Sequence, residues 1–205
     1  MTLRLPFGRY ALPVILLLLV AASGCSIVPK TPAPTVVQLA QPAFAPDLTT
    51  PAGRKTLRID TPLANALLDS NRLLVMAEPN TLSAYAGVRW NDTAPALVRG
   101  RLAYWLRTSG TFRAVSTERD SYSTDLLLSG ELLAWHLNTQ TRPAQVELRF
   151  DALLGVPASQ HLQASRQFQV TAPLAGTGLQ AVVDAFTQAT DTLARDITRW
   201  VSQAH

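Results

Sequence analysis

Two alternating runs late in the chain constrain its fold more than any other feature. In residues 144–152 every second side chain is apolar and the ones between are polar. Residues 162–170 repeat the pattern, broken only at Arg166, and the run Gly155–Gln160 separates the two. Such alternation is typical of strands with one buried and one wet face, and a short loop joins such strands as an antiparallel hairpin. The sequence therefore predicts a sheet with one dry face.

Two amphipathic segments are expected to cover that dry face. Asp92 is a predicted N-cap, the apolar residues of Val98–Leu106 share one helical face, and Gly110 ends the segment. In the segment Leu179–Val201 the apolar residues fall within about 120° of arc at 100° per residue. We interpret this second stripe as the lid of the core. The alternative is that part of it contacts a partner.

Further β-like runs complete the pattern. They lie at residues 57–60, 73–77, 85–88, 112–116 and 126–137, the last with Gly130 as a possible bulge. The chain order is then β-β-β-α-β-β-β-β-α. This order predicts an α+β fold, a two-layer sandwich in which two amphipathic helices pack on one face of a mostly antiparallel sheet. The other face is wet, paired with a partner, or covered by the N-terminal segment.

The first 25 residues resemble a secretory leader. Residues 1–9 carry two arginines and no acidic residue, residues 11–20 are apolar, and small residues follow. The apolar run is shorter than the roughly twenty residues that span a bilayer. Ala22–Cys25 resembles a bacterial lipobox, and Cys25 is the only cysteine of the chain. The sequence predicts cleavage before Cys25 and its lipidation, with three acyl chains as an effectively permanent anchor. Bacterial lipoproteins with aspartate directly after the lipidated cysteine tend to stay in the inner membrane. Ser26 takes that place here, so the resemblance implies the periplasmic face of the outer membrane.

A proline-rich stretch separates this leader from the rest. Six of the 14 prolines lie between Pro29 and Pro51, a density that favours an extended spacer. Within it, residues 35–39 (TVVQL) are a candidate edge strand. We therefore divide the chain into a cleaved signal peptide (1–24), a lipidated cysteine with a proline-rich tether (25–55) and one domain (56–205).

Composition and motifs argue against an enzyme. The single cysteine excludes a disulfide scaffold and a cysteine-rich metal site. No phosphate-binding glycine loop, nucleophile elbow or zinc-protease motif is present, and His136, His161 and His205 are scattered. We expect no catalytic residue, no metal and no cofactor. Without Arg4 and Arg9, which lie in the predicted signal peptide, the chain has 16 basic and 14 acidic residues, so its net charge is only +2. An exported protein does not meet nucleic acid, so the predicted signal peptide excludes nucleic acid as a partner.

One arginine-rich region is a candidate partner contact. Five arginines and a single acidic residue lie between Arg89 and Arg113. The first interpretation is a solvated face; the alternative is a surface for an acidic partner or lipid headgroups. Trp and Arg are also frequent at binding hot spots, although a core role for the tryptophan is equally open. The candidate contact residues are Tyr85, Arg89, Trp90, Arg99 and Arg101.

Several short motifs resemble one family in their order and spacing. They are LRIDTP at 57–62, LDSNRLLV at 68–75, LSAYAGVRW at 82–90, LRTSG at 106–110 and the closing helix at 181–200. In these motifs and in its lipobox the chain resembles the ABC-type transport auxiliary lipoproteins, the PqiC/YmbA-like family.

The resemblance implies a non-catalytic outer-membrane lipoprotein. Its partner would be the MCE (mammalian cell entry) domain protein of an ABC transport system, which bridges the periplasm and carries lipids or other hydrophobic molecules. Self-association into a homo-oligomeric ring is also implied. The alternative is a periplasmic lipid- or sterol-binding carrier, and a hydrolase is the weakest hypothesis. A deep pocket would favour the carrier, whereas a flat apolar patch on a filled domain favours docking.

Overall fold

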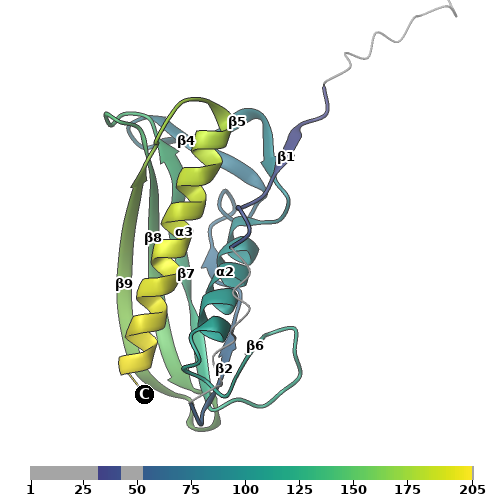
Figure 1. The fold of residues 1–205 in the computed structure, drawn as a ribbon, viewed down its shortest axis with the longest axis vertical. Helices are drawn as coiled ribbons and strands as arrows, with labels where there is room; N and C mark the ends of the chain where they lie inside the picture. Colours follow the sequence, from purple (N-terminus) through teal and green to yellow (C-terminus); the bar gives the residue numbers. More distant parts are fainter. Residues whose placement is uncertain (1–31, 43–52, 205) are drawn as a thin grey trace, which may run out of the picture. The chain divides into compact units, whose positions relative to one another are not determined.

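A nine-stranded sheet and two α-helices make up the described part of the chain, residues 32–42 and 53–204 of the computed structural model (Figure 1). The predicted signal peptide, Cys25 and part of the predicted tether lie outside the described residues. The strands are β1 (Thr35–Val37), β2 (Thr56–Ile59), β3 (Leu63–Ala64), β4 (Arg72–Glu78), β5 (Thr81–Trp90), β6 (Ala114–Thr117), β7 (Leu126–Asn138), β8 (Gln145–Val156) and β9 (His161–Pro173). The helices are α2 (Ala94–Thr108), the short 3₁₀ turn η1 (Pro157–Ser159) and α3 (Gly178–Gln203).

Strand β7 organises the sheet. Along one side it pairs in succession with β2, β3 and β4, all parallel to it. Along the other side it pairs antiparallel with β8, which continues to β9 through the predicted hairpin. Beyond β4 lie antiparallel β5 and then parallel β1. The α+β prediction is confirmed, and the sheet is mixed, because β2, β3 and β4 reach β7 through long connections rather than through hairpins.

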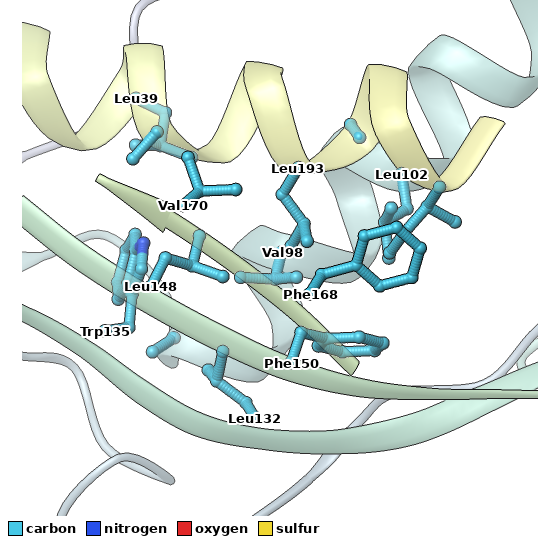
Figure 2. Close-up of a cluster of buried hydrophobic side chains, with 14 of the residues drawn as sticks. Leu39, Val98, Leu102, Leu132, Trp135, Leu148, Phe150, Phe168, Val170 and Leu193 are labelled. Carbon is cyan, nitrogen blue, oxygen red and sulfur yellow. The ribbon is translucent and has the colours of Figure 1, made fainter. Parts of the chain in front are cut away.

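Both helices pack on the same face of the sheet. Figure 2 shows Val98 of α2 and Leu193 of α3 gathered with Leu132, Leu148 and Phe150 of the sheet. All of these side chains are buried, and the alternation along β8 places its apolar residues on this dry face as predicted. The stripe of α3 is likewise buried, which confirms the lid interpretation.

The segment around β1 is part of the same packed unit. The unit starts at Pro34, and β1 pairs with β5 at the sheet edge, as expected for the TVVQL stretch. Leu39 is buried in the core. The N–H of Ala40 donates to Thr187 Oγ1 (3.1 Å), and its carbonyl accepts from Arg101 Nη2 (2.5 Å). Packing therefore begins before Thr56, the first residue of the predicted domain.

Two local predictions differ from the structure. The N-cap of α2 is Thr93 rather than Asp92, whose carboxylate instead accepts the N–H of Thr93 (2.7 Å). The bulge in β7 falls between Leu132 and Ala134 rather than at Gly130. Glycine is needed at position 130 for close packing, because a Cβ there would lie 2.1 Å from the carbonyl oxygen of Asp151.

The longest helix of the described part is α3, with 26 residues, and α2 has 15. None of the described helices combines the length and the apolar character that crossing a bilayer requires.

Candidate docking surface

The sheet face opposite the helices, which we call the open face, carries the alternate residues of β7, β8 and β9. Polar side chains predominate on it along β8, where Glu147, Arg149 and Asp151 follow one another at every second position. Towards the β8–β9 turn the pattern changes, because Leu153 takes the next place in this series and is 40% exposed. The open face is therefore polar along much of β8 and apolar near the turn.

The apolar region consists of four leucines, which we call the leucine patch: Leu63, Leu127, Leu153 and Leu162. Directly paired residues point to the same face of a sheet, and the pairing register places all four leucines on the open face. The pairs are Leu63 with Glu131, Leu153 with Ser129, and both Leu127 and Leu162 with Gly155. Leu63 and Leu162 are 74% and 54% exposed. Isolated exposed leucines are common, whereas a cluster with a polar border is typical of an interaction surface.

Gly155 gives this patch its shape. It lies between Leu127 and Leu162 in the register, and without a side chain it leaves the two leucines separated. A hollow of about 270 Å³ results, lined by Leu153, Val156 and these two leucines among others. A single apolar side chain from a partner fits a hollow of this size.

Charged and amide side chains border the patch. Next to Leu127 on β2 is Arg58, whose Nε donates to Asp60 Oδ1 at 2.8 Å. On the other side Asp151 Oδ1 accepts from Gln167 Nε2 at 2.8 Å. Arg58, Asp60 and Asp151 are thus already paired. Glu131, which pairs with Leu63 in the register, is exposed and has no partner among the described residues, so a partner that covers the leucines must also provide a donor for this carboxylate.

Trp90, one of the predicted contact residues, is a core residue. Its ring centroid lies 4.9 Å from that of Trp135 and 5.1 Å from that of Phe186, and the side chain is almost fully buried. The Trp135 indole N–H in turn donates to Thr190 Oγ1 (3.2 Å). The core interpretation of Trp90 is therefore correct, and its assignment to a surface contact is wrong.

Arg101 is also buried, and its charge has internal partners. Besides the Ala40 carbonyl, it contacts Asp191 Oδ1 at 3.3 Å, and that carboxylate also accepts the indole N–H of Trp105 at 2.9 Å. Its assignment to a surface contact is wrong as well, because the guanidinium holds the β1 segment against α2 and α3.

The other three predicted residues differ in exposure. Arg99 is half-buried and donates to Thr61 Oγ1 (2.7 Å) and to Glu118. Burial raises the pKa of Glu118, but the hydrogen bond from Thr61, one from its own backbone and then the Arg99 guanidinium together outweigh it and hold the pKa below its usual value. Tyr85 is half-buried and Arg89 is exposed. Tyr85 and Arg89 thus remain candidate contact residues.

The leucine patch could have been found in the sequence. Leu153 and Leu154 are adjacent at the end of the alternating run, and Leu126, Leu127 and Leu128 are consecutive. In a strand, adjacent leucines point to opposite faces, so both faces are apolar there. What the sequence does not show is the pairing that brings Leu63 and Leu162 to the same place.

A family model, described as the ABC-type transport auxiliary lipoprotein component, matches residues 38–198. The chain belongs to this auxiliary lipoprotein family. The predicted membership is confirmed, and it makes the protein a lipoprotein-type component of an ABC-type transport system. The family is one of transport components and is not described as a family of enzymes.

Solved structures share the fold of this auxiliary lipoprotein. A protein of Xanthomonas campestris is 23% identical, with a TM-score of 0.72 over 83% of this chain and 96% of its own. A hypothetical protein of Chlamydia trachomatis is 7% identical, with a TM-score of 0.52 over 74% of this chain and 98% of its own. At these identities the likeness concerns the fold alone. No curated protein sequence matches the chain.

Among the described residues, His136 and His161 do not gather with other metal-binding side chains. In residues 32–42 and 53–204, no three His, Cys, Asp or Glu residues lie together as a metal ion would require. His136 is buried on the open face with its Nε2 at 3.7 Å from Glu147 Oε2, and His161 is exposed at the start of β9.

Proposed function

We propose that this auxiliary lipoprotein is held at the periplasmic face of the outer membrane by acyl chains on Cys25, and that its leucine patch docks the MCE-domain protein of its transport system. It performs no catalysis and contributes a binding surface at the end of the periplasmic bridge. The observation that carries the proposal is the exposed leucine patch on a domain whose family is a transport component.

The filled interior favours docking over the alternative of a lipid carrier. A carrier that encloses its ligand between sheet and helices needs space there. In this protein that layer is occupied by large, fully buried side chains, among them Trp90 and Phe186. Figure 2 shows two more of them, Trp135 and Phe150, between the sheet and the helices. The exposed apolar area lies instead on the outside, where it is accessible to another protein.

The test is capture of the MCE-domain protein by the lipidated protein extracted from membranes. The double variant Leu153→Ser/Leu162→Ser removes two exposed leucines without changing charge or the dry face. If both are hot-spot contacts worth about 2 kcal/mol together, the affinity falls about thirty-fold. Tyr122→Ser is the control, because Tyr122 is 74% exposed, lies on the loop between β6 and β7 and does not line the hollow of the patch.

Three outcomes contradict the proposal in different ways. Equal capture by the double variant and the wild type places the docking surface elsewhere. Equal loss with Tyr122→Ser indicates a nonspecific apolar effect. A stoichiometric lipid or sterol that remains bound to the purified domain favours the carrier. Sedimentation of the same detergent-extracted sample also tests the implied homo-oligomeric ring.

A further inference from the structure

A row of three exposed side chains crosses the open face far from the leucine patch. Val36 of β1 pairs with Arg89 of β5, and Arg89 pairs with Arg72 of β4. Directly paired residues point to the same face, and since the neighbouring Trp90 points into the core, Arg89 points to the open face. We call Val36, Arg89 and Arg72 the arginine row.

The two arginines of this row have no counter-ion among the described residues. Within the described part of the chain, neither guanidinium has a hydrogen-bond or ion-pair partner, and both side chains are exposed. Like charges directly opposite each other in a sheet are destabilising. The pair thus presents two fork-shaped donors that suit an anionic oxygen group such as a phosphate.

The third member of the row adds an apolar contact next to the charges. Val36 is 51% exposed and lies beside Arg89 at the sheet edge. Exposed apolar and basic side chains side by side are typical of surfaces that bind lipid headgroups, where the apolar group reaches below the charged layer. A free inorganic anion would gain nothing from Val36.

Chain length allows this surface to reach the membrane. Ten residues lie between Cys25 and Val36, and fully extended this stretch of chain spans at most about 40 Å. Across the sheet the order is β1-β5-β4-β7-β8-β9, so the arginine row occupies the first three strands and most of the leucine patch the last three. The edge nearest the tether is therefore the edge that carries the basic row, and the leucine patch stays free.

From this juxtaposition we propose that Val36, Arg89 and Arg72 form a membrane-contact surface that binds the phosphates of anionic phospholipid headgroups in the leaflet that holds the acyl chains. The inference rests on the proposed anchor at Cys25. It adds a second attachment that fixes the orientation of the domain, with the leucine patch directed to the partner.

The experiment uses the lipidated full-length protein reconstituted in vesicles. With Cys25 acylated, Val36→Cys introduces a single free thiol for an environment-sensitive fluorophore. The vesicles contain either phosphatidylcholine alone or phosphatidylcholine with phosphatidylglycerol. We expect a blue shift of the fluorophore and its quenching by spin-labelled lipids only with phosphatidylglycerol. Arg72→Gln/Arg89→Gln should lower the ratio of membrane-bound to free domain about twenty-five-fold, since each basic residue contributes about five-fold near an anionic surface.

A charge-matched variant provides the control. Arg113→Gln/Arg119→Gln removes the same two charges from exposed positions next to β6, at the other end of the described domain (Figure 1). This control variant should still show the blue shift of the fluorophore with phosphatidylglycerol. An equal response of both variants, or no response to phosphatidylglycerol in the wild type, would overturn the inference. Abolition of the shift by inorganic phosphate, but not by chloride at equal ionic strength, would show a site for free anions and overturn it too.

Failure of the anchor is distinguishable from failure of this surface. Intact mass of the reconstituted protein reports the acyl chains independently of the fluorophore. An acylated protein that stays on phosphatidylcholine vesicles without a response to phosphatidylglycerol contradicts the membrane-contact surface alone. A protein without acyl mass contradicts the anchor.

Discussion

At the scale of single residues, the type of a side chain did not predict whether it is buried or exposed, because that depends on where the fold places it. Trp90 and Arg101 have the residue types of binding hot spots, yet both are buried. Side chains in β5 alternate between the two faces of the sheet, and Trp90 is on the face that contacts Trp135 and Phe186. For Arg101 the deciding contact is with the β1 segment, whose backbone carbonyl the guanidinium holds. Neither contact partner adjoins them in the sequence, so composition could not separate core from surface.

Substitutions of Trp90 test this correction. Trp90→Ala should lower the free energy of unfolding by about 3–5 kcal/mol, as aromatic-to-alanine changes in cores do. Trp90→Phe should cost only about 1 kcal/mol, because the buried indole N–H has no hydrogen-bond partner among the described residues and little polar bonding is lost. Denaturant titration of both variants is the measurement. Similar losses in the two variants would contradict this expectation.

His136 should make stability depend on pH. Burial lowers its pKa below the usual 6.5, the carboxylate of Glu147 opposes this and Arg149 adds to it. The unfolded chain then binds a proton at a higher pH than the folded protein, so stability rises with pH. The free energy of unfolding should fall as the pH decreases from about 7.5 through 6.5 and level off below the lowered folded pKa. His136→Gln should flatten this part of the profile, and an unchanged slope would contradict the assignment.

At the scale of elements, the periodicity of the sequence predicted which helices and strands form but not which strands pair with one another. The alternation of 144–152 and the apolar stripe of 179–201 yielded β8 and α3 with a shift of a few residues at their ends. The parallel pairing of β7 with β2, β3 and β4 follows from contacts across long loops, and no local pattern encodes it. The leucine patch depends on that pairing, which explains why its members could be seen as adjacent leucines but not as one surface.

Helix α3 allows a direct test of the lid interpretation. Leu193 and Phe186 are fully buried, so Leu193→Ala and Phe186→Ala should each lower the free energy of unfolding by about 2–5 kcal/mol. Gln188→Ala, on the exposed side of the same helix, should stay within about 0.5 kcal/mol of the wild type. Thermal and denaturant unfolding measure all three. Melting temperatures within a degree of the wild type for the two core variants would refute the lid role.

At the scale of the whole molecule, the N-terminal attachment and the fold act together. The β1 segment is bonded to β5, α2 and α3, so the chain that comes from Cys25 is fixed to the domain at its sheet edge. An anchor joined to a freely swinging domain would leave the open face without a direction. The pairing of β1 gives the proposed anchor a defined point of attachment.

Lipidation at Cys25 is itself testable. Intact mass of the membrane-extracted protein should correspond to a chain that begins at residue 25 and carries acyl mass, because the lipobox ends at the only cysteine. Cys25→Ser should leave uncleaved precursor in the inner membrane. A mature chain that retains Met1, or one cut elsewhere without lipid, would rule the prediction out.

The central position of β7 has a consequence for how such a chain acquires its structure. β2, β3 and β4 all find their partner in residues 126–138, which emerge much later in synthesis or export. Until then their edges stay unpaired, and unpaired edges promote misassembly. Pairings between distant residues also slow folding. Such a chain should therefore depend on holding chaperones for longer than a hairpin-built domain of equal size, and damage to β7 should appear as proteolysis of the newly made chain before it appears as lost function.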